Sequence, residues 1–314
     1  TLSSSLVTIA SGSASVSATA NATGGGPYSV TASASGVASA NQASFSLTNT
    51  KATATATLSN LSHTYDGATK PATCTTAPAG LATTITYDGG SALPRNAGSY
   101  AVVCTVSDAS YSGSTNGTLS IAKGNQTISF TNPGTVNLSA RTVSLTYSAS
   151  SGLPVSVSSD SPSICSVSGS LVTLLGAGTC SLTASQGGDG NYNAATSVTQ
   201  TFSVTALGTT TAVTSVTPNP AIYGQPVSLT ASVTASAGDT APGGQVQFSL
   251  GGKSCLAVLG NASGRISTAT CSLNATTGFP GVGTQTVTAT YTPGSSAFTG
   301  SSGTGSLTVT AATT

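Results

Sequence analysis

The sequence predicts an all-β chain made of tandem β-sandwich modules. Ser and Thr supply roughly a third of its 314 residues, and apolar residues alternate with them at the period of two that is typical of half-buried strands. A two-strand segment recurs four times, which indicates repeated modules. Helical bundles and coiled coils draw heavily on Glu, Lys and Arg, and this chain has no Glu and only 7 Lys and Arg. An α-rich fold is therefore excluded.

The first strand of the recurring segment opens with Gly. It continues with mainly apolar residues two and four positions further on, separated mainly by Ser or Thr. The four copies begin at Gly26, Gly98, Gly178 and Gly283. This pattern predicts a half-buried strand near the end of each module.

A loop and a second alternating strand follow each copy. These second strands end near Asn49, Lys123, Ala206 and Thr310. Three of the four loops carry an aromatic residue 13, 14 or 15 positions past the opening Gly, namely Tyr111, Tyr192 and Phe298. We expect one hairpin to close every module, with these aromatic rings packed beneath it rather than offered to a sugar.

The hairpins divide the chain into four modules. We expect a partial module, the C-terminal half only, at residues 1–49, and complete modules at 50–123, 124–206 and 207–314. Each complete module has room for the short strands of an immunoglobulin-like sandwich. Since the linkers are very short, we expect a semi-rigid rod that reaches on the order of 150 Å.

The six cysteines predict disulfides, because their number is even and no CxxC motif is present. The repeats place two cysteines in each complete module. We therefore pair Cys74 with Cys104, Cys165 with Cys180, and Cys255 with Cys271. Stable disulfides need an oxidising compartment, so an extracellular or cell-surface location is expected, with any export signal ahead of Thr1.

The second module carries the most specific motifs in the chain. Tyr65-Asp66-Gly67 is followed by Ile-Thr-Tyr-Asp-Gly at 85–89, Asn-Ala-Gly-Ser-Tyr at 96–100 and Gly-Thr-Leu-Ser-Ile-Ala-Lys at 117–123. This stretch resembles the MBG type of bacterial Ig-like module. The third and fourth modules are similar to other bacterial Ig-like repeats, through Leu-Leu-Gly-Ala-Gly-Thr-Cys at 174–180 and Tyr-Gly-Gln-Pro-Val at 223–227. The resemblance implies a repetitive surface or secreted protein, with no catalytic residues to transfer.

The scarcity of charge excludes several classes of function. Seven scattered cations cannot neutralise a nucleic-acid backbone, and no apolar run approaches the length of a membrane span. His63 is the only histidine, so a catalytic triad or a zinc site cannot be assembled around it. We predict no catalytic residue, no cofactor and no metal site. His63 is expected to be a turn or surface residue.

Two weaker candidates remain in the turns. The segment 187–193 suggests a calcium loop, but Asp189 is its only carboxylate and calcium prefers several. Lys51, Lys70, Lys123 and Lys253 could form isopeptide bonds if one of them were buried beside an Asn or Asp. Their positions near turns and module junctions argue against this.

These observations favour a non-enzymatic extracellular structural protein, part of a bacterial surface fibre or filament or of an adhesin stalk. Its expected partners are copies of itself or the adjoining Ig-like modules of a longer chain. The incomplete module 1–49 suggests polymerisation, head to tail, by strand complementation. The alternative is an adhesive module that binds carbohydrate or another surface.

Overall fold

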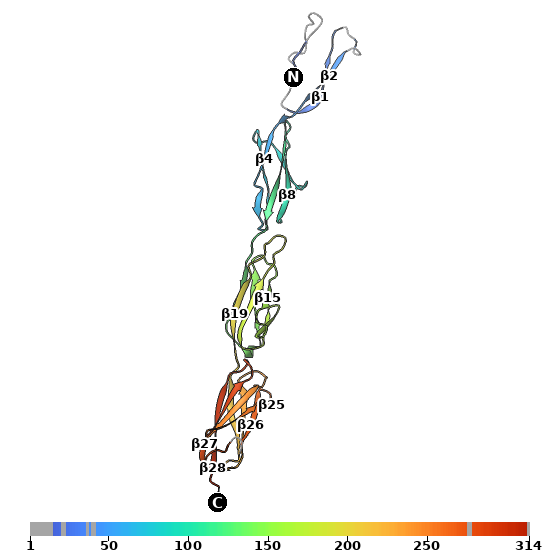
Figure 1. Cartoon of the computed structure of the whole chain (residues 1–314). Helices are drawn as coiled ribbons and strands as arrows, with labels where there is room; N and C mark the ends of the chain where they lie inside the picture. Colours follow the sequence, from blue (N-terminus) through green and yellow to red (C-terminus); the bar gives the residue numbers. More distant parts are fainter. Residues whose placement is uncertain (1–14, 20–22, 36–37, 39–41, 275–277, 313–314) are drawn as a thin grey trace. The chain divides into compact units, whose positions relative to one another are not determined.

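The computed structural model describes residues 15–19, 23–35, 38, 42–274 and 278–312 (Figure 1). Regular structure in these residues is β-strand apart from one short 3-10 segment, η2 (Leu138–Ala140). The prediction of an all-β fold is therefore confirmed. No helix among the described residues is long and apolar enough to cross a membrane. By their contacts, the residues fall into two units: Thr1–Asn125 with Gly188–Ala194, and Gln126–Gly187 with Ala195–Thr314.

The first unit contains one separate hairpin and a set of sheets with a shared core. Its strands are β1 (Gly25–Ala32), β2 (Ala43–Asn49), β3 (Ala52–Thr53), β4 (Thr55–Ser59), β5 (Ser62–Thr64), β6 (Thr73–Ala77), β7 (Thr83–Tyr87), β8 (Gly98–Val106), β9 (Tyr111–Ser112) and β10 (Ser114–Ala122). Strands β1 and β2 form a two-stranded sheet. The others form a four-stranded sheet in the order β5-β10-β8-β7 and the pairs β4-β6 and β3-β9.

The core of this unit lies between the β5-β10-β8-β7 sheet and the β4-β6 pair. Val102 and Cys104 on β8 and Leu119 on β10 are fully buried in it. The residues between them are mostly exposed. Burial of a Val or Leu side chain stabilises a fold by about 1.5–3 kcal/mol, so the alternation in sequence directly selects which face of each strand turns inward.

The second unit contains the remaining strands. From 126 to 205 they are β11 (Ile128–Phe130), β12 (Val136–Asn137), β13 (Thr142–Ser144), β14 (Tyr147–Ala149), β15 (Ser156–Ser159), β16 (Cys165–Ser168), β17 (Leu171–Leu174), β18 (Gly178–Ser185) and β19 (Val198–Thr205). They form sheets of order β12-β19-β18-β15 and β13-β17-β16 and the pair β11-β14. Leu182, Val172 and Phe202 lie in the core between these sheets.

The last stretch of the second unit has the longest strands and the largest core. Its strands are β20 (Thr209–Thr217), β21 (Ala221–Ile222), β22 (Val227–Ala235), β23 (Gly244–Leu250), β24 (Lys253–Val258), β25 (Gly260–Ser263), β26 (Ile266–Leu273), β27 (Gly283–Pro293) and β28 (Ser301–Thr310). Two sheets, β20-β22-β26-β25 and β21-β28-β27-β23-β24, pack face to face. Along β22, Val227, Leu229, Ala231 and Val233 are fully buried, while the residues that alternate with them are half-buried.

The predicted closing hairpin occurs four times, as expected from the repeats. The antiparallel pairs are β1–β2, β8–β10, β18–β19 and β27–β28. The module boundaries at residues 49, 123 and 206 stay predictions. The loop Gly188–Ala194, which joins β18 to β19, belongs by its contacts to the first unit.

Candidate functional site

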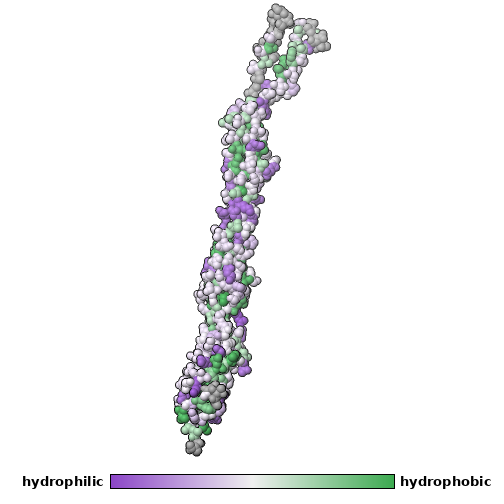
Figure 2. Space-filling view, viewed as in Figure 1, coloured by the Kyte–Doolittle hydropathy of each residue, from purple (hydrophilic) through white to green (hydrophobic). Residues whose placement is uncertain are grey.

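The hairpin β1–β2 differs from the other closing hairpins of the described residues because most of its large apolar side chains are exposed. Tyr28 lies opposite Leu47, and Val30 lies opposite Phe45, so the four side chains occupy one face of the ribbon. Phe45 is 56% exposed, Tyr28 45% and Leu47 39%. Figure 2 shows hydrophobic atoms on this hairpin.

The equivalent residues of the other three hairpins are buried. The position of Phe45 corresponds to Leu119, Phe202 and Leu307 in the repeated strand, and these are 0–4% exposed. The position of Leu47 corresponds to Ile121, Val204 and Val309, each 3% exposed. The same residue types therefore serve as core in three modules and as surface in the first.

The other hairpins are also flanked within their sheets. In each of them the last strand pairs in parallel with a short early strand: β10 with β5, β19 with β12 and β28 with β21. The penultimate strands pair with β7, β15 and β23 on the other side. Among the described residues the sheet of β1 and β2 has only these two strands. A complete module would need two flanking strands and a facing sheet.

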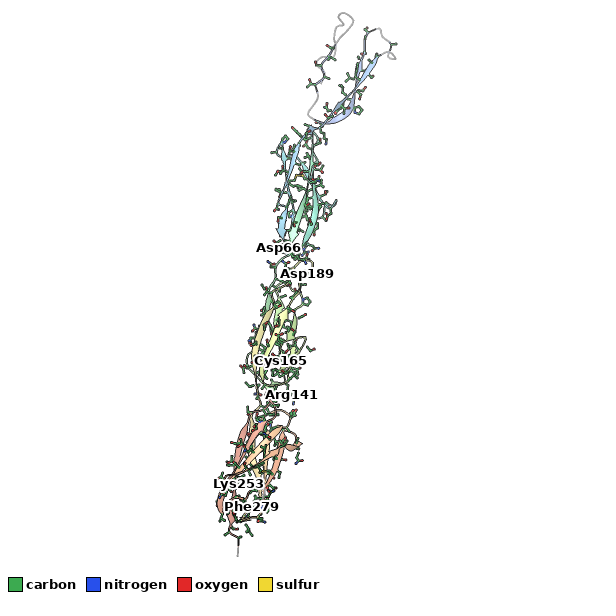
Figure 3. All side chains as sticks on the ribbon, viewed as in Figure 1. Asp66, Arg141, Cys165, Asp189, Lys253 and Phe279 are labelled. Atoms are coloured by element: carbon green, nitrogen blue, oxygen red, sulfur yellow. A yellow bond between two sulfur atoms is a disulfide. The ribbon has the colours of Figure 1, made fainter. Side chains whose placement is uncertain are left out.

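The three disulfides join the cysteines that the module pattern pairs. They are Cys74–Cys104, Cys165–Cys180 and Cys255–Cys271, with Cα–Cα distances of 6.4, 5.9 and 6.3 Å. Each bridge connects strands from two different sheets: β6 to β8, β16 to β18 and β24 to β26. Cys104, Cys165 and Cys180 are fully buried (Cys165 is labelled in Figure 3). The bridges therefore tie the two layers of each module together.

His63 lies on a strand and not in a turn, so this part of the prediction was wrong. It is the middle residue of β5, opposite Ile121 of β10, and its Nε2 lies 2.9 Å from the main-chain oxygen of Asn60. This strand could not be predicted, because β5 is three residues long and too short to show an alternating pattern. The ring is half-buried, and its contact with the main-chain oxygen of Asn60 fits a structural role.

Asp66 forms the polar turn that the Asp-Gly sequence predicts. Its carboxylate accepts hydrogen bonds from the Lys70 ammonium at 2.7 Å and from the main-chain N–H of Ala68 at 2.9 Å. The Lys70 hydrogen bond, together with that of Ala68, lowers the pKa of Asp66 below its ordinary value. The residue is exposed, so this ion pair contributes little to stability.

The segment 187–193 shows no arrangement suited to calcium. The Oδ1 atom of Asp189 accepts hydrogen bonds from the main-chain N–H groups of Asn191 and Tyr192, at 2.8 and 2.7 Å. Within the part of the chain that the structure describes, no three His, Cys, Asp or Glu side chains gather closely enough to hold a metal ion. The carboxylate instead shapes the turn, as Asx turns do.

The loops that carry Tyr111, Tyr192 and Phe298 pair with main-chain groups, and none of these three side chains is exposed. Each forms a parallel bridge with a residue that lies just after a closing hairpin: Ala52 with Tyr111, Gly124 with Tyr192 and Leu207 with Phe298. Tyr192 also meets Tyr65 edge to face, and Phe298 is 8% exposed. The rings are therefore structural parts of these contacts and do not form an exposed platform for sugars.

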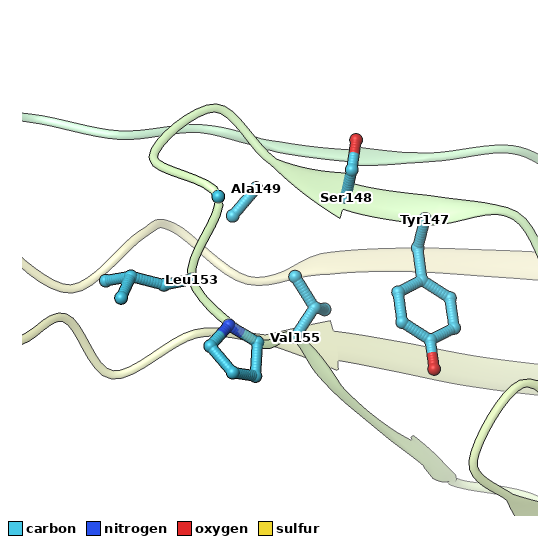
Figure 4. Close-up of a pocket in the computed structure, with 7 residues that line it drawn as sticks. Tyr147, Ser148, Ala149, Leu153 and Val155 are labelled. Atoms are coloured by element: carbon cyan, nitrogen blue, oxygen red, sulfur yellow. The ribbon is translucent and has the colours of Figure 1, made fainter.

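A shallow depression lies on the second unit, beside β14 (Figure 4). It has a volume of about 390 Å³ and is lined by Tyr147, Leu153, Pro154 and Val155, with Ser148 as its polar side chain. Tyr147 packs edge to face on Phe130, with ring centroids 6.2 Å apart. The depression offers apolar contact and no charged group to a ligand.

The sequence matches two families of bacterial repeat domains. The MBG domain family matches residues 54–125, and the bacterial Ig-like domain family (group 3) matches residues 213–311. The chain is a bacterial Ig-like repeat protein with an MBG module. The resemblance stated from the Tyr-Asp-Gly motifs is thus confirmed. No curated protein matches this Ig-like repeat protein.

Several solved structures are similar to the Ig-like repeat chain. One is a structure described under host cell surface retention of a 1.5-MDa bacterial ice-binding adhesin. It is 14% identical to this chain, the match covers 84% of this chain and 100% of that chain, and the TM-score is 0.34. The Escherichia coli adhesin FdeC has 15% identity over 82% and 96%, TM-score 0.30. A tetra-tandem repeat in the extending region of a large adhesion protein has 22% identity over 81% and 74%, TM-score 0.31. At these values the similarities identify neither a ligand nor a partner.

Proposed function

We propose that this chain is a non-enzymatic structural segment of a bacterial surface fibre or adhesin stalk, and that a neighbouring copy completes its first hairpin. The exposed apolar face of β1–β2 carries the proposal. Phe45 and Leu47 belong to a strand type that is core in every complete module, yet both side chains are exposed here. Exposed apolar strands of this kind recruit further strands.

Family and chemistry support the surface location. Both matched families are bacterial Ig-like repeats, and three disulfides suit an oxidising environment outside the cytoplasm. The hydroxyl groups of Ser and Thr keep such a surface hydrated. Because these groups carry no charge, its hydration depends little on pH or salt concentration. If the location is right, antibodies raised against the chain should label intact cells of the source bacterium. Labelling only after cell lysis would contradict it.

Completion by a second copy would use different surfaces on the two partners. A contact of this type is heterologous and adds subunits without closing, so it produces open filaments. The occupant would supply a strand parallel to β2, a strand antiparallel to β1, and a facing sheet, by analogy with β5, β7 and β4–β6. These strands would be uncharged and rich in Ser, Thr and Val.

The test uses the full chain and two double variants. Phe45→Ser/Leu47→Ser removes the apolar face, whereas Leu256→Ser/Val258→Ser removes two exposed apolar side chains from β24. We expect the wild type and the β24 control to form concentration-dependent oligomers in sedimentation and electron microscopy, and the hairpin variant to stay monomeric. A wild type that remains monomeric at high concentration, or a hairpin variant that still assembles, would refute completion by copies.

The carbohydrate-binding alternative is checked independently with a glycan array of several polysaccharide classes. The proposed structural role predicts no hits. The rod that the short linkers predict is measured by small-angle X-ray scattering, with an expected maximum dimension on the order of 150 Å. A much smaller dimension would contradict an extended arrangement.

A further inference from the structure

Three contacts of the same geometry recur in the chain, and we call them joints. In each joint, the segment that leaves a closing hairpin lies parallel to an aromatic loop. The main-chain N–H groups of Ala52, Gly124 and Leu207 donate to the carbonyl oxygens of Ser110, Asn191 and Ala297, at 2.8, 2.9 and 2.9 Å. Loop residues donate back in the second and third joints: Asn193 to Gly124, and Thr299 to Leu207.

A lysine stands directly before the bridged residue in the first two joints. The ammonium of Lys51 donates to the main-chain oxygen of Asp108, and that of Lys123 donates to the main-chain oxygen of Asp189, both at 2.5 Å. Each lysine thus ties the departing segment to one end of the loop that it follows. A charge-assisted hydrogen bond of this kind is about twice as strong as a neutral one.

In the first two joints the side chain of the loop aspartate also accepts hydrogen bonds, in addition to its main-chain oxygen. The Oδ1 atom of Asp108 accepts the N–H groups of Ser110 and Tyr111, at 2.7 and 3.2 Å. Asp189 repeats this arrangement with Asn191 and Tyr192. The sequence Asp-Xaa-Xaa-Tyr therefore fixes the loop shape and presents a carbonyl oxygen to the lysine.

The third joint has uncharged residues in place of the lysine and the aspartate. Ala206 stands at the lysine position and Ser295 at the aspartate position, three residues before Phe298. Leu207 and Phe298 are 6% and 8% exposed and belong to the core of β20–β28. Leu138 of η2 packs against the same core. Burial, rather than a cation, holds this joint together.

Charge is concentrated at the joints in a chain that has little of it. Of the 13 charged side chains, the first joint uses Lys51 and Asp108. The second joint has Lys123 and Asp189, and beside it lie Asp66, Lys70 and Arg95, of which Arg95 donates to the Gly67 carbonyl. Arg141 pairs with Asp239 within the second unit. Figure 2 shows a hydrophilic band where Figure 3 labels Asp66 and Asp189.

We propose that these residues make each joint selective for the exit segment and the loop that it pairs. We call the segment that leaves a closing hairpin its exit. An exit that carries Lys pairs with an Asp-Xaa-Xaa-Tyr loop, and an exit that carries Ala-Leu pairs with a Ser-Xaa-Xaa-Phe loop. An Ala-Leu exit does not fit the second joint, because a side chain at Gly124 would put its Cβ 2.7 Å from the Tyr65 carbonyl oxygen and 3.3 Å from the Tyr192 ring. Such rejection of the wrong partner is how specificity is commonly built. The inference goes beyond the proposed function and does not depend on it.

The test follows hydrogen exchange at single amides in the full chain. In Lys123→Ala we expect the Gly124 and Asn193 amides to exchange about tenfold faster, as the loss of a charge-assisted hydrogen bond predicts. Lys253→Ala, the same change on β24, should leave them unchanged, as should the conservative variant Lys123→Arg. The Leu207 and Thr299 amides of the third joint serve as internal references. Unchanged exchange at Gly124 and Asn193 in Lys123→Ala would overturn the role of the lysine.

Exchanged exits test the specificity itself. The double variant Lys123→Ala/Gly124→Leu gives the second joint the exit of the third, and Ala206→Lys/Leu207→Gly does the reverse. We expect each variant to lose protection at its own joint by more than tenfold and to keep wild-type exchange at the other. Wild-type protection in either exchanged joint would refute the proposal. Protection lost throughout the chain would also refute it, since the effect would then not be specific to a joint.

Discussion

Tyr65 and Tyr192 meet edge to face, with ring centroids 5.2 Å apart and an interplanar angle of 90°. Tyr65 follows β5, whereas Tyr192 belongs to the loop between β18 and β19, so the contact joins distant parts of the sequence. Both rings are half-buried, and Gly124 lies against the Tyr192 ring and the main-chain oxygen of Tyr65. The pair is the aromatic centre of the second joint.

The first prediction concerns the energy of this pair. Edge-to-face aromatic pairs contribute about 0.5–1.5 kcal/mol beyond the area they bury. A double-mutant cycle with Tyr65→Leu and Tyr192→Leu, measured by thermal unfolding, should therefore give a coupling free energy of about 1 kcal/mol. The same cycle between Tyr192 and the exposed Tyr28 is the control and should give additive effects. Additivity in both cycles would show that the ring contact contributes nothing.

The second prediction concerns the space at Gly124. Because a Cβ there would approach the Tyr65 carbonyl oxygen to 2.7 Å, Gly124→Ala should destabilise the first unit by about 1–3 kcal/mol. Gly190 lies in the loop that Gly124 contacts, and a Cβ added at Gly190 would meet nothing within 4 Å. Gly190→Ala is therefore the matched control and should be nearly neutral. Equal melting temperatures for the two variants would contradict the crowding at Gly124.

The strands that bury one face could be predicted from the sequence, and the shortest strands could not. Alternation around Val102, Leu182 and Val287 indicates the closing hairpins directly, because a period of two leaves one buried face. Strands of two or three residues, such as β3 and β5, carry no period. Their pairing is decided by the sheets beside them, which the local sequence does not describe.

The joints were only partly visible in the sequence. The similar spacing of Tyr111, Tyr192 and Phe298 after their opening glycines predicted a structural role, but not the segment that each loop contacts. Each of these contacts is made with the segment that leaves the preceding hairpin, which is far from the loop in the sequence. The recurrence of Asp-Xaa-Xaa-Tyr at 108–111 and 189–192, with Lys51 and Lys123 at equivalent positions, was the signal that could have identified the joints.

The third prediction is the order in which the disulfides are reduced. Cys165 and Cys180 are both fully buried, whereas Cys255 and Cys271 are both half-buried. A reductant needs access to a sulfur atom, so Cys255–Cys271 should open first and Cys165–Cys180 last. Timed alkylation with mass spectrometry measures this order, and peptide mapping without reduction checks the three pairs. A bridge between cysteines of different predicted modules would contradict both the pairing and the module boundaries.

Complete reduction should also lower the melting temperature of the region 50–314. In the chain-entropy model a closed loop of 15 residues contributes roughly 3 kcal/mol, a model-dependent figure. Residues 1–49 contain no cysteine and should be indifferent to reductant. Hydrogen exchange followed separately for β1–β2 and for the other hairpins distinguishes the two responses. Equal changes in both would refute the assignment of the stabilisation to the bridges.

The last prediction concerns Tyr291 and alkaline pH. The side chain is 2% exposed, and its hydroxyl donates to the main-chain oxygen of Gly243 at 2.7 Å. Burial raises the pKa of Tyr291 above its ordinary value of 10.0. The folded state therefore favours the neutral phenol. The stability that it contributes is fully present below pH 10 and is lost as pH rises through the folded-state pKa.

Thermal unfolding at pH 9 and pH 11 tests this sign with one matched pair of variants. Tyr291→Phe should cost about 1 kcal/mol at pH 9, because the Gly243 oxygen loses its donor, and should then lose less stability than the wild type between pH 9 and pH 11. Tyr223 is 52% exposed, so Tyr223→Phe should leave the pH dependence unchanged. If Tyr291→Phe and the wild type lost equal stability over this interval, ionisation of the buried phenol would not be what weakens the fold at high pH.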